Sequence, residues 1–175
     1  MTRRLFIFGL GYSGLVLAQA AQAAGWTVAG TCRSPDKAAG LARRGIDAHA
    51  FDGTVPIDPA RLADSTHVIC TIAPGSGGDP ALGTSAEALK GARWLGYLST
   101  TGVYGDRGGG WVDEDTPPNP GQARSRERLA AEQAWQALGR SSGAAVDIFR
   151  LPGIYGPGRS ALDQVRAGTA RRIDK

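Results

Sequence analysis

The amino-acid sequence predicts an α/β fold, a doubly wound parallel sheet with helices on both faces. The first observation is the apolar run of residues 5–8, which has no polar break and is typical of a strand buried on both faces. The second is the glycine spacing G-x-G-x-x-G, which follows this run directly and opens a helix. The third is the alternation of strand and helix patterns along the chain. At 175 residues, the chain is expected to form one domain over residues 1–175.

Glycine, proline and capping residues set the boundaries of the other elements. Ser34, Pro35 and Asp36 predict a helix start, as cap, first helical residue and first-turn acid. Gly25 and Gly45 each follow the predicted end of a helix. Predicted strands cover residues 5–8, 26–31, 46–51, 66–72, 94–99 and 144–151, predicted helices cover residues 15–24, 35–44, 82–90, 124–138 and 161–167, and a short turn surrounds residue 62.

The second half of the chain holds the clearest helix and the longest loop. Residues 124–138 form the helix, because their apolar residues keep the helical period. This apolar stripe consists of Ala130, Ala131, Ala134, Trp135 and Leu138. Residues 105–122 are polar and rich in glycine and proline, which predicts a long loop that is functional or mobile. Residues 170–175 are expected to form a turn with no further strand.

Composition and charge exclude several classes of partner. The net charge is +4 and the sequence pI is about 9.4, but the basic residues are scattered. They are not interleaved with aromatic residues and belong to no nucleic-acid motif, so nucleic acid is not expected as a partner. No apolar run approaches the ~20 residues that a membrane span needs. The first residues lead straight into a strand without a signal-peptide cleavage site, which predicts a cytoplasmic protein.

The cysteines and histidines point to neither a disulfide nor a metal site. Cys32 and Cys70 fall at the ends of the second and fourth predicted strands, which flank the first strand in a doubly wound sheet. Two strand spacings separate them by about 10 Å, too far for a disulfide, so free thiols are expected. His49 and His67 have no partner at a metal-ligand spacing, and no metal is expected.

The glycine motif predicts a dinucleotide site. Gly9 would permit a tight bend, Gly11 would let the backbone approach a pyrophosphate, and Gly14 would let the helix pack against the strand. The helix N-terminus would then face the phosphates. A glycine-rich turn without a ligand is the alternative, but the position between a strand and a helix is the context that favours a binding motif.

Three motifs together resemble the extended short-chain dehydrogenase/reductases of the NAD-dependent epimerase/dehydratase type. They are the glycine motif, the sequence YLSTTGVYG at residues 97–105, and RLPGIYGPG at residues 150–158. The resemblance covers nearly the whole chain and implies a Rossmann domain that binds NAD or NADP. Family members continue into a smaller C-terminal region that completes a sugar-nucleotide site, so the resemblance implies that this region is missing here. Thr100 matches the family's catalytic Ser/Thr; alternatively, its hydroxyl only satisfies a strand end.

The chain departs from the family at the catalytic pair Tyr-x-x-x-Lys. Arg124 stands in the tyrosine position and Arg128 in the lysine position, which places the chain among atypical members of the superfamily. Arginine stays protonated in proteins, so Arg124 cannot act as a general base. Tyr104 is the phenol nearest to Thr100 in sequence and is the candidate substitute acid.

Two interpretations of the arginines remain open. Arg124 and Arg128 lie on one ridge with Ala131 and Trp135, so both border the apolar stripe. They could form a cleft site for a phosphate or carboxylate of a substrate. Alternatively, Arg128 and Glu132 form a surface pair worth only ~0.5 kcal/mol.

The end of the second strand indicates the choice of cofactor. NAD-binding domains usually place an acid there, but this chain has Arg33 and no acid before Asp36. A guanidinium suits a 2′-phosphate, so NADP is expected in preference to NAD. The cofactor-binding residues expected from the motifs and the resemblance are Gly9, Gly11, Tyr12, Ser13, Gly14, Arg33, Asp52, Ala73 and Pro152.

Two functions therefore remain open. One is an NADP-dependent oxidoreductase or epimerase with a rearranged proton donor, acting on an unknown small molecule that could be anionic. The other is a non-catalytic NADP-binding protein that senses redox state or binds a partner. A homodimer is left open, and exposed apolar surface is expected to cause self-association.

Overall fold

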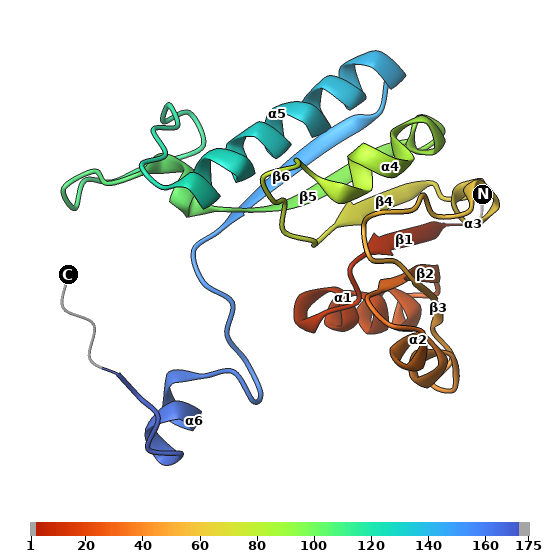
Figure 1. The fold of residues 1–175 in the computed structure, drawn as a ribbon, viewed down its shortest axis with the longest axis horizontal. Coiled ribbons are helices and arrows are strands. Elements are labelled where there is room, and N and C mark those ends of the chain that lie inside the picture. Colours follow the sequence, from red (N-terminus) through yellow and green to blue (C-terminus); the bar gives the residue numbers. More distant parts are fainter. Residues whose placement is uncertain (1–2, 172–175) are drawn as a thin grey trace.

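The computed structural model describes residues 3–171, and six strands form one parallel sheet in the order β3-β2-β1-β4-β5-β6 (Figure 1). The predicted doubly wound fold is thus confirmed. The strands are β1 (Arg4–Phe8), β2 (Thr27–Cys32), β3 (Asp47–Ala50), β4 (His67–Cys70), β5 (Trp94–Thr100) and β6 (Ala145–Leu151). The helices are α1 (Tyr12–Ala23), α2 (Pro35–Ala42), α3 (Pro59–Leu62), α4 (Pro80–Leu89), α5 (Ala123–Ser142) and α6 (Ala161–Arg166), with a 3-10 turn η1 (Thr101–Tyr104).

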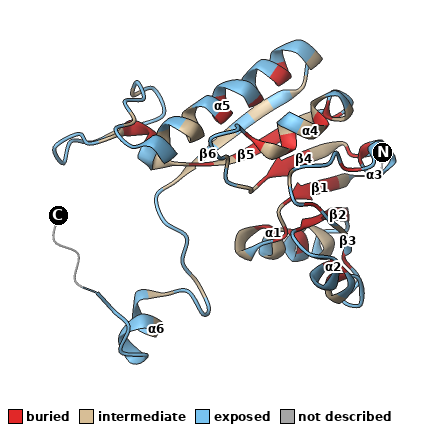
Figure 2. Cartoon of the chain, viewed as in Figure 1, coloured by how far each residue is buried: buried red, intermediate tan, exposed pale blue. Residues whose placement is uncertain are grey.

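Helices cover the two faces of the sheet, with α1 and α2 on one side and α4 and α5 on the other (Figure 1). Successive β1 side chains alternate between these faces, which puts Phe6 and Phe8 in the core cluster with Trp135 of α5. Leu5 and Ile7 point the opposite way, into the cluster with Leu41 of α2. Residues 5–8 are therefore buried on both faces, as predicted from the unbroken apolar run (Figure 2).

Local sequence signals explain where most helices begin and end. Ser34 caps α2 by accepting a hydrogen bond from the Lys37 amide at 3.3 Å, and Pro35 occupies the first helical position, as predicted. Asp79 caps α4 through bonds from the amides of Ala81 and Leu82. The long helix α5 continues beyond its predicted end to Gly143, which adopts the left-handed conformation that closes helices.

The predicted apolar stripe of α5 is only partly correct. Ala130 and Ala134 are exposed, and the buried face consists of Ala131, Glu132, Trp135, Leu138 and Gly139. Ala131, Trp135 and Leu138 are spaced by four and three residues and therefore lie on one side of the helix. Ala130 and Ala134 each precede a buried residue by one position, so their side chains point away from the sheet. Gly139 belongs to this face because the Val146 side chain occupies the place where a Cβ would lie, at 2.2 Å.

The segment after β6 leaves the sheet and carries α6, which buries none of its residues (Figures 1 and 2). The predicted loop at residues 105–122 is confirmed, since it contains no helix or strand. Cys32 and Cys70 are buried free thiols, as predicted. Of the turn expected at residues 170–175, residues 172–175 lie outside the described part. Within residues 3–171, no helix has the length and hydropathy to cross a membrane, and no cluster of His, Cys, Asp and Glu could hold a metal.

An apolar groove of about 640 Å³ lies on the α1 side of the sheet. Helix α1 packs on β1 and β2, whereas α5 contacts β5 and β6 from the opposite face. The groove therefore exposes parts of the sheet that a helix would ordinarily cover. Its aromatic lining consists of Trp26, His67, Trp94 and Phe149.

Candidate functional site

The glycine turn after β1 has the tight geometry that its motif predicts. Gly9 has φ +97°, and a Cβ there would lie 2.6 Å from Oγ1 of Thr71. A Cβ on Gly14 would lie 2.1 Å from the carbonyl oxygen of Gly9, so only glycine lets α1 pack this closely on the turn. At Gly11 the same position faces open space, which leaves the backbone accessible to a ligand.

Two threonines from neighbouring strands hold this turn in place. Thr31 at the end of β2 accepts a hydrogen bond from the Gly9 amide at 3.0 Å, through its hydroxyl. Thr71, just after β4, donates its hydroxyl proton to the Gly9 carbonyl at 2.7 Å. Sequence reasoning missed both residues, although hydroxyls at the ends of the two strands that flank β1 were a usable signal. The turn is thus fixed before any ligand arrives.

The N-terminus of α1 is free of side-chain caps. Its N-cap residue is Gly11, which has no side chain to accept from the first amides of the helix. Amides in the first turn of a helix have no acceptor within the helix, and the helix dipole is positive there. The arrangement therefore favours a negatively charged group at this point.

A cavity of about 420 Å³ opens beside the turn, at the carboxyl ends of β1 to β4. Of the predicted cofactor residues, it is lined by Gly9, Gly11, Arg33, Asp52 and Ala73. Lys37 from α2 lines the same cavity, so two cations sit at its β2 end. Hydrogen bonds from the Thr54 amide at 2.9 Å and hydroxyl at 2.7 Å lower the pKa of Asp52, which keeps this carboxyl ionised at neutral pH.

The other predicted cofactor residues lie outside this cavity. Gly14 packs against the turn, and Ser13 lines the apolar groove on the α1 side. Tyr12 is the first residue of α1, and its hydroxyl donates to the Pro157 carbonyl at 3.2 Å. Pro152 follows β6 directly and is exposed.

The carboxyl end of β5 carries a pair of hydroxyls. Thr100 ends the strand and accepts a hydrogen bond from the Gly102 amide at 3.1 Å, so its oxygen does satisfy a strand end while its proton remains available to donate. A Cβ built on Gly102 would lie 3.0 Å from Oγ of Ser125 and 3.4 Å from Oγ1 of Thr100. Ser125 on α5, which sequence reasoning missed, therefore lies beside the same glycine.

The two arginines of α5 have different surroundings. Arg124 is exposed in the first turn of the helix. The Arg128 guanidinium instead bends toward β5, where it donates to the Leu98 carbonyl at 2.6 Å and to the Tyr97 hydroxyl at 3.3 Å. It also lies over the Tyr97 ring, 5.8 Å from the centroid. Of the two arginines on the predicted ridge, Arg124 is therefore exposed, whereas Arg128 is bonded to the sheet.

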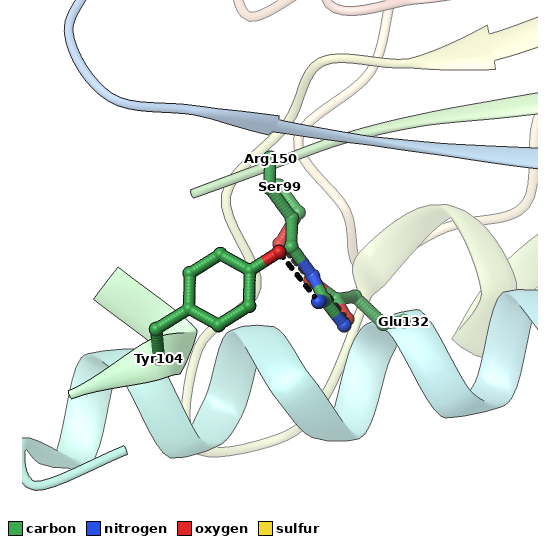
Figure 3. A network of polar contacts seen from close by, with 4 residues as sticks. All are labelled: Ser99, Tyr104, Glu132 and Arg150. Atoms are coloured by element: carbon green, nitrogen blue, oxygen red, sulfur yellow. Dashed lines mark hydrogen bonds and ion pairs between the residues drawn. The ribbon is translucent and has the colours of Figure 1, made fainter. Parts of the chain in front are cut away.

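The alternative prediction of an Arg128–Glu132 surface pair is wrong. Glu132 is 1% exposed and forms an ion pair with Arg150 at 2.8 Å (Figure 3). It also accepts the hydroxyl proton of Ser99. Ser99 and Arg150 stand opposite each other in the β5–β6 register, so both side chains reach α5 from one face of the sheet. This register is a tertiary property that helical spacing alone does not reveal.

Tyr104, the candidate substitute acid, belongs to the same network. Its hydroxyl accepts a hydrogen bond from Nη1 of Arg150 at 3.0 Å, and the guanidinium lies over its ring, 4.8 Å from the centroid (Figure 3). The side chain is 5% exposed. The phenol is therefore held inside the domain by Arg150.

Comparisons with known proteins agree with this architecture. The NAD dependent epimerase/dehydratase family model matches residues 81–175. Protein YeeZ of Escherichia coli (strain K12) is 32% identical, and the match covers 90% of this chain and 61% of YeeZ. A functionally unknown conserved protein from Silicibacter pomeroyi DSS is 42% identical, with a TM-score of 0.86 over 99% of this chain and 61% of that protein.

A more distant solved structure shares the fold. The UDP-glucuronic acid 4-epimerase from Bacillus cereus, solved in complex with NAD, is 19% identical with a TM-score of 0.72, over 94% of this chain and 63% of that enzyme. The chain thus spans about 61% of the length of YeeZ and of the Silicibacter protein. Because the family match covers more than half of the chain, this chain belongs to the NAD-dependent epimerase/dehydratase family.

Proposed function

We propose that this chain is an NADP-binding domain of an atypical epimerase/dehydratase-type oxidoreductase, in which the usual phenol proton donor is absent. The observation that carries the cofactor preference is the lining of one cavity by the glycine turn, Arg33 and Lys37. The end of β2 carries no carboxylate to accept from a ribose 2′-hydroxyl. A guanidinium and an ammonium at that point favour the 2′-phosphate that distinguishes NADP from NAD.

The rest of the cavity suits the remaining parts of a dinucleotide. Gly11 and the uncapped N-terminus of α1 would receive the pyrophosphate. Asp52 would accept a hydrogen bond from the adenine amino group, since its ionised carboxylate faces the same cavity. Ala73 and Pro152, after β4 and β6, would border the nicotinamide half. When bound, the nicotinamide would supply hydride chemistry.

The polar groups at the end of β5 would orient a substrate. Thr100 can donate its hydroxyl proton to a carbonyl, and Ser125 offers a second hydroxyl beside it. Arg128 retains the positive charge of the family lysine. Arg124 cannot move a proton at neutral pH, so the usual coupling of proton and hydride transfer would be lost. Its exposed guanidinium would instead bind an anionic group of the substrate.

The test is the affinity for NADPH against NADH, measured by fluorescence titration. We expect NADPH to bind about tenfold or more tightly, because a charge-assisted hydrogen bond contributes about 1.5–3 kcal/mol. Arg33→Ala should remove most of the difference. Arg44→Ala is the matched control, an exposed arginine beyond the end of α2 that loses the same charge. Equal affinities of the wild-type chain for the two cofactors would refute the preference.

A second candidate function is a non-catalytic NADP-binding protein. The observation in its favour is that the two family positions for proton transfer hold arginines, of which Arg128 is already bonded to β5. A screen of carbonyl and nucleotide-sugar substrates separates the two functions. Turnover that is lost in Arg124→Ala and Thr100→Ala would support the enzyme. Tight NADPH binding without turnover would support the sensor, and turnover that survives both changes would mean that the catalytic site lies elsewhere.

A further inference from the structure

The loop after β6 is attached to the glycine motif at the opposite end of the sequence. Residues 156 and 159 form a tight turn with reciprocal backbone hydrogen bonds of 3.1 and 2.9 Å. Within that turn, the Pro157 carbonyl accepts the Tyr12 hydroxyl proton at 3.2 Å. Gly156 packs so closely that a Cβ there would lie 2.3 Å from the same hydroxyl oxygen. Tyr12 therefore fixes the position of the turn.

This attachment places the Arg159 side chain over the Tyr12 ring, with its guanidinium carbon 5.6 Å from the ring centroid. Stacking on an aromatic face leaves the N–H groups at the edge of a guanidinium free to donate. Within residues 3–171, no carboxylate pairs with Arg159 and no acceptor takes a hydrogen bond from its guanidinium. Arg159 is thus an exposed arginine that rests on the Tyr12 ring, and its donors have no partner among the described residues.

The position of Tyr12 indicates what those donors face. Tyr12 is the first residue of α1 and directly follows the N-cap Gly11, so its side chain projects from the uncapped end of the helix. Both the helix dipole and the free amides favour an anion there. Arg159, stacked on the Tyr12 ring, adds a full positive charge beside the first residue of α1 and comes from a different segment.

We propose that Arg159 is a diphosphate-binding residue beside the N-terminus of α1, and that Tyr12 is the positioning residue that holds it. The inference rests on the proposed function, because the diphosphate nearest to Tyr12 would be that of the dinucleotide. A nucleotide-diphosphate substrate carries the same group. Guanidinium and diphosphate match in charge and in planar donor geometry, and the fixed turn reduces the entropy lost on binding.

The experiment compares Arg159→Ala with Arg166→Ala, which removes an equal charge from the exposed helix α6. Arg159→Ala is expected to weaken NADPH binding about tenfold, the loss for one charge-assisted contact, whereas Arg166→Ala changes it less than about twofold. Adenosine 2′-monophosphate, which has no diphosphate, should bind both variants like the wild type. Tyr12→Phe removes the bond to Pro157 but keeps the ring, and should weaken NADPH less than Arg159→Ala does.

The remaining arms distinguish the source of the diphosphate. If Arg159→Ala leaves NADPH unchanged but weakens UDP binding to the NADP-loaded chain about tenfold, Arg159 binds the diphosphate of a nucleotide substrate. If it weakens neither ligand more than Arg166→Ala does, the proposal is overturned. A wild-type chain that binds no NADPH would refute the proposed function. Inorganic pyrophosphate would then still test Arg159. It should raise the melting temperature of the wild type but not that of Arg159→Ala. If pyrophosphate raises the melting temperature of both chains equally, or of neither, the proposal fails.

Discussion

Replacing Glu132 with glutamine should destabilise the domain strongly. Glu132 is 1% exposed and accepts hydrogen bonds from Nε and Nη2 of Arg150 and from the Ser99 hydroxyl (Figure 3). The amide keeps the shape but leaves the Arg150 charge without a counterion. Removing one partner of a buried ion pair costs about 3–5 kcal/mol. The Arg150 side chain is 20% exposed and retains some contact with water, so we expect the lower value, about 3 kcal/mol.

Urea unfolding followed by far-UV circular dichroism measures this loss. In a chain of this size, about 3 kcal/mol lowers the melting temperature by roughly 6–12 °C. The double variant Glu132→Leu, Arg150→Met removes both charges, and it should be more stable than either single variant, because no unpaired charge stays in the core. A loss below about 1 kcal/mol for Glu132→Gln would refute the reasoning, since Arg150 would then be solvated adequately without its partner.

Two further outcomes concern the apolar groove. Burial and two nearby arginines lower the pKa of His67. Below about pH 6.5 the unfolded chain therefore binds a proton that the folded chain does not, so stability should fall as pH decreases. In His67→Phe, the urea midpoint should depend less on pH between about pH 6.5 and 5. An unchanged pH profile would contradict this. The chain should also self-associate through the groove, and Phe149→Ser should shift light-scattering mass toward the monomer, unlike Val55→Ser, which removes an exposed side chain outside the groove.

The sequence was sufficient to predict the fold because the signals for it are local. The run at residues 5–8 and the glycine spacing depend on neighbours in the chain, and the close contact of Gly14 with Gly9 follows from the motif itself. Alternating strands and helices predict a parallel sheet, and a glycine motif after the first strand is typical of the order with β1 between β2 and β4, which the structure has. The Ser34 cap could likewise be predicted from residues 34–37 alone.

The contacts around α5 could not be predicted in the same way. Helical spacing puts Glu132 one turn after Arg128, which indicates a surface pair. The β5–β6 register instead brings Ser99 and Arg150 under the helix, and Arg150 outcompetes Arg128 for the carboxylate. Arg128 then bonds to the Leu98 carbonyl. Each of these outcomes depends on which residues of two strands stand opposite each other, information that no single segment carries.

The geometry around β5 bears on whether proton transfer would accompany hydride transfer in the proposed function. Arg124 and Arg128 stay charged at any physiological pH, so neither can accept a proton. Burial raises the pKa of Tyr97, whose hydroxyl lies under Arg128, which disfavours the phenolate that a general base requires. Tyr104 follows Thr100 by four residues, but its side chain is 5% exposed and its hydroxyl oxygen accepts a hydrogen bond from Arg150, which holds the phenol inside the domain. Under the proposed function, Thr100 would orient and polarise a carbonyl, whereas a proton would have to come from solvent or from a group other than Arg124, Arg128 and Tyr97.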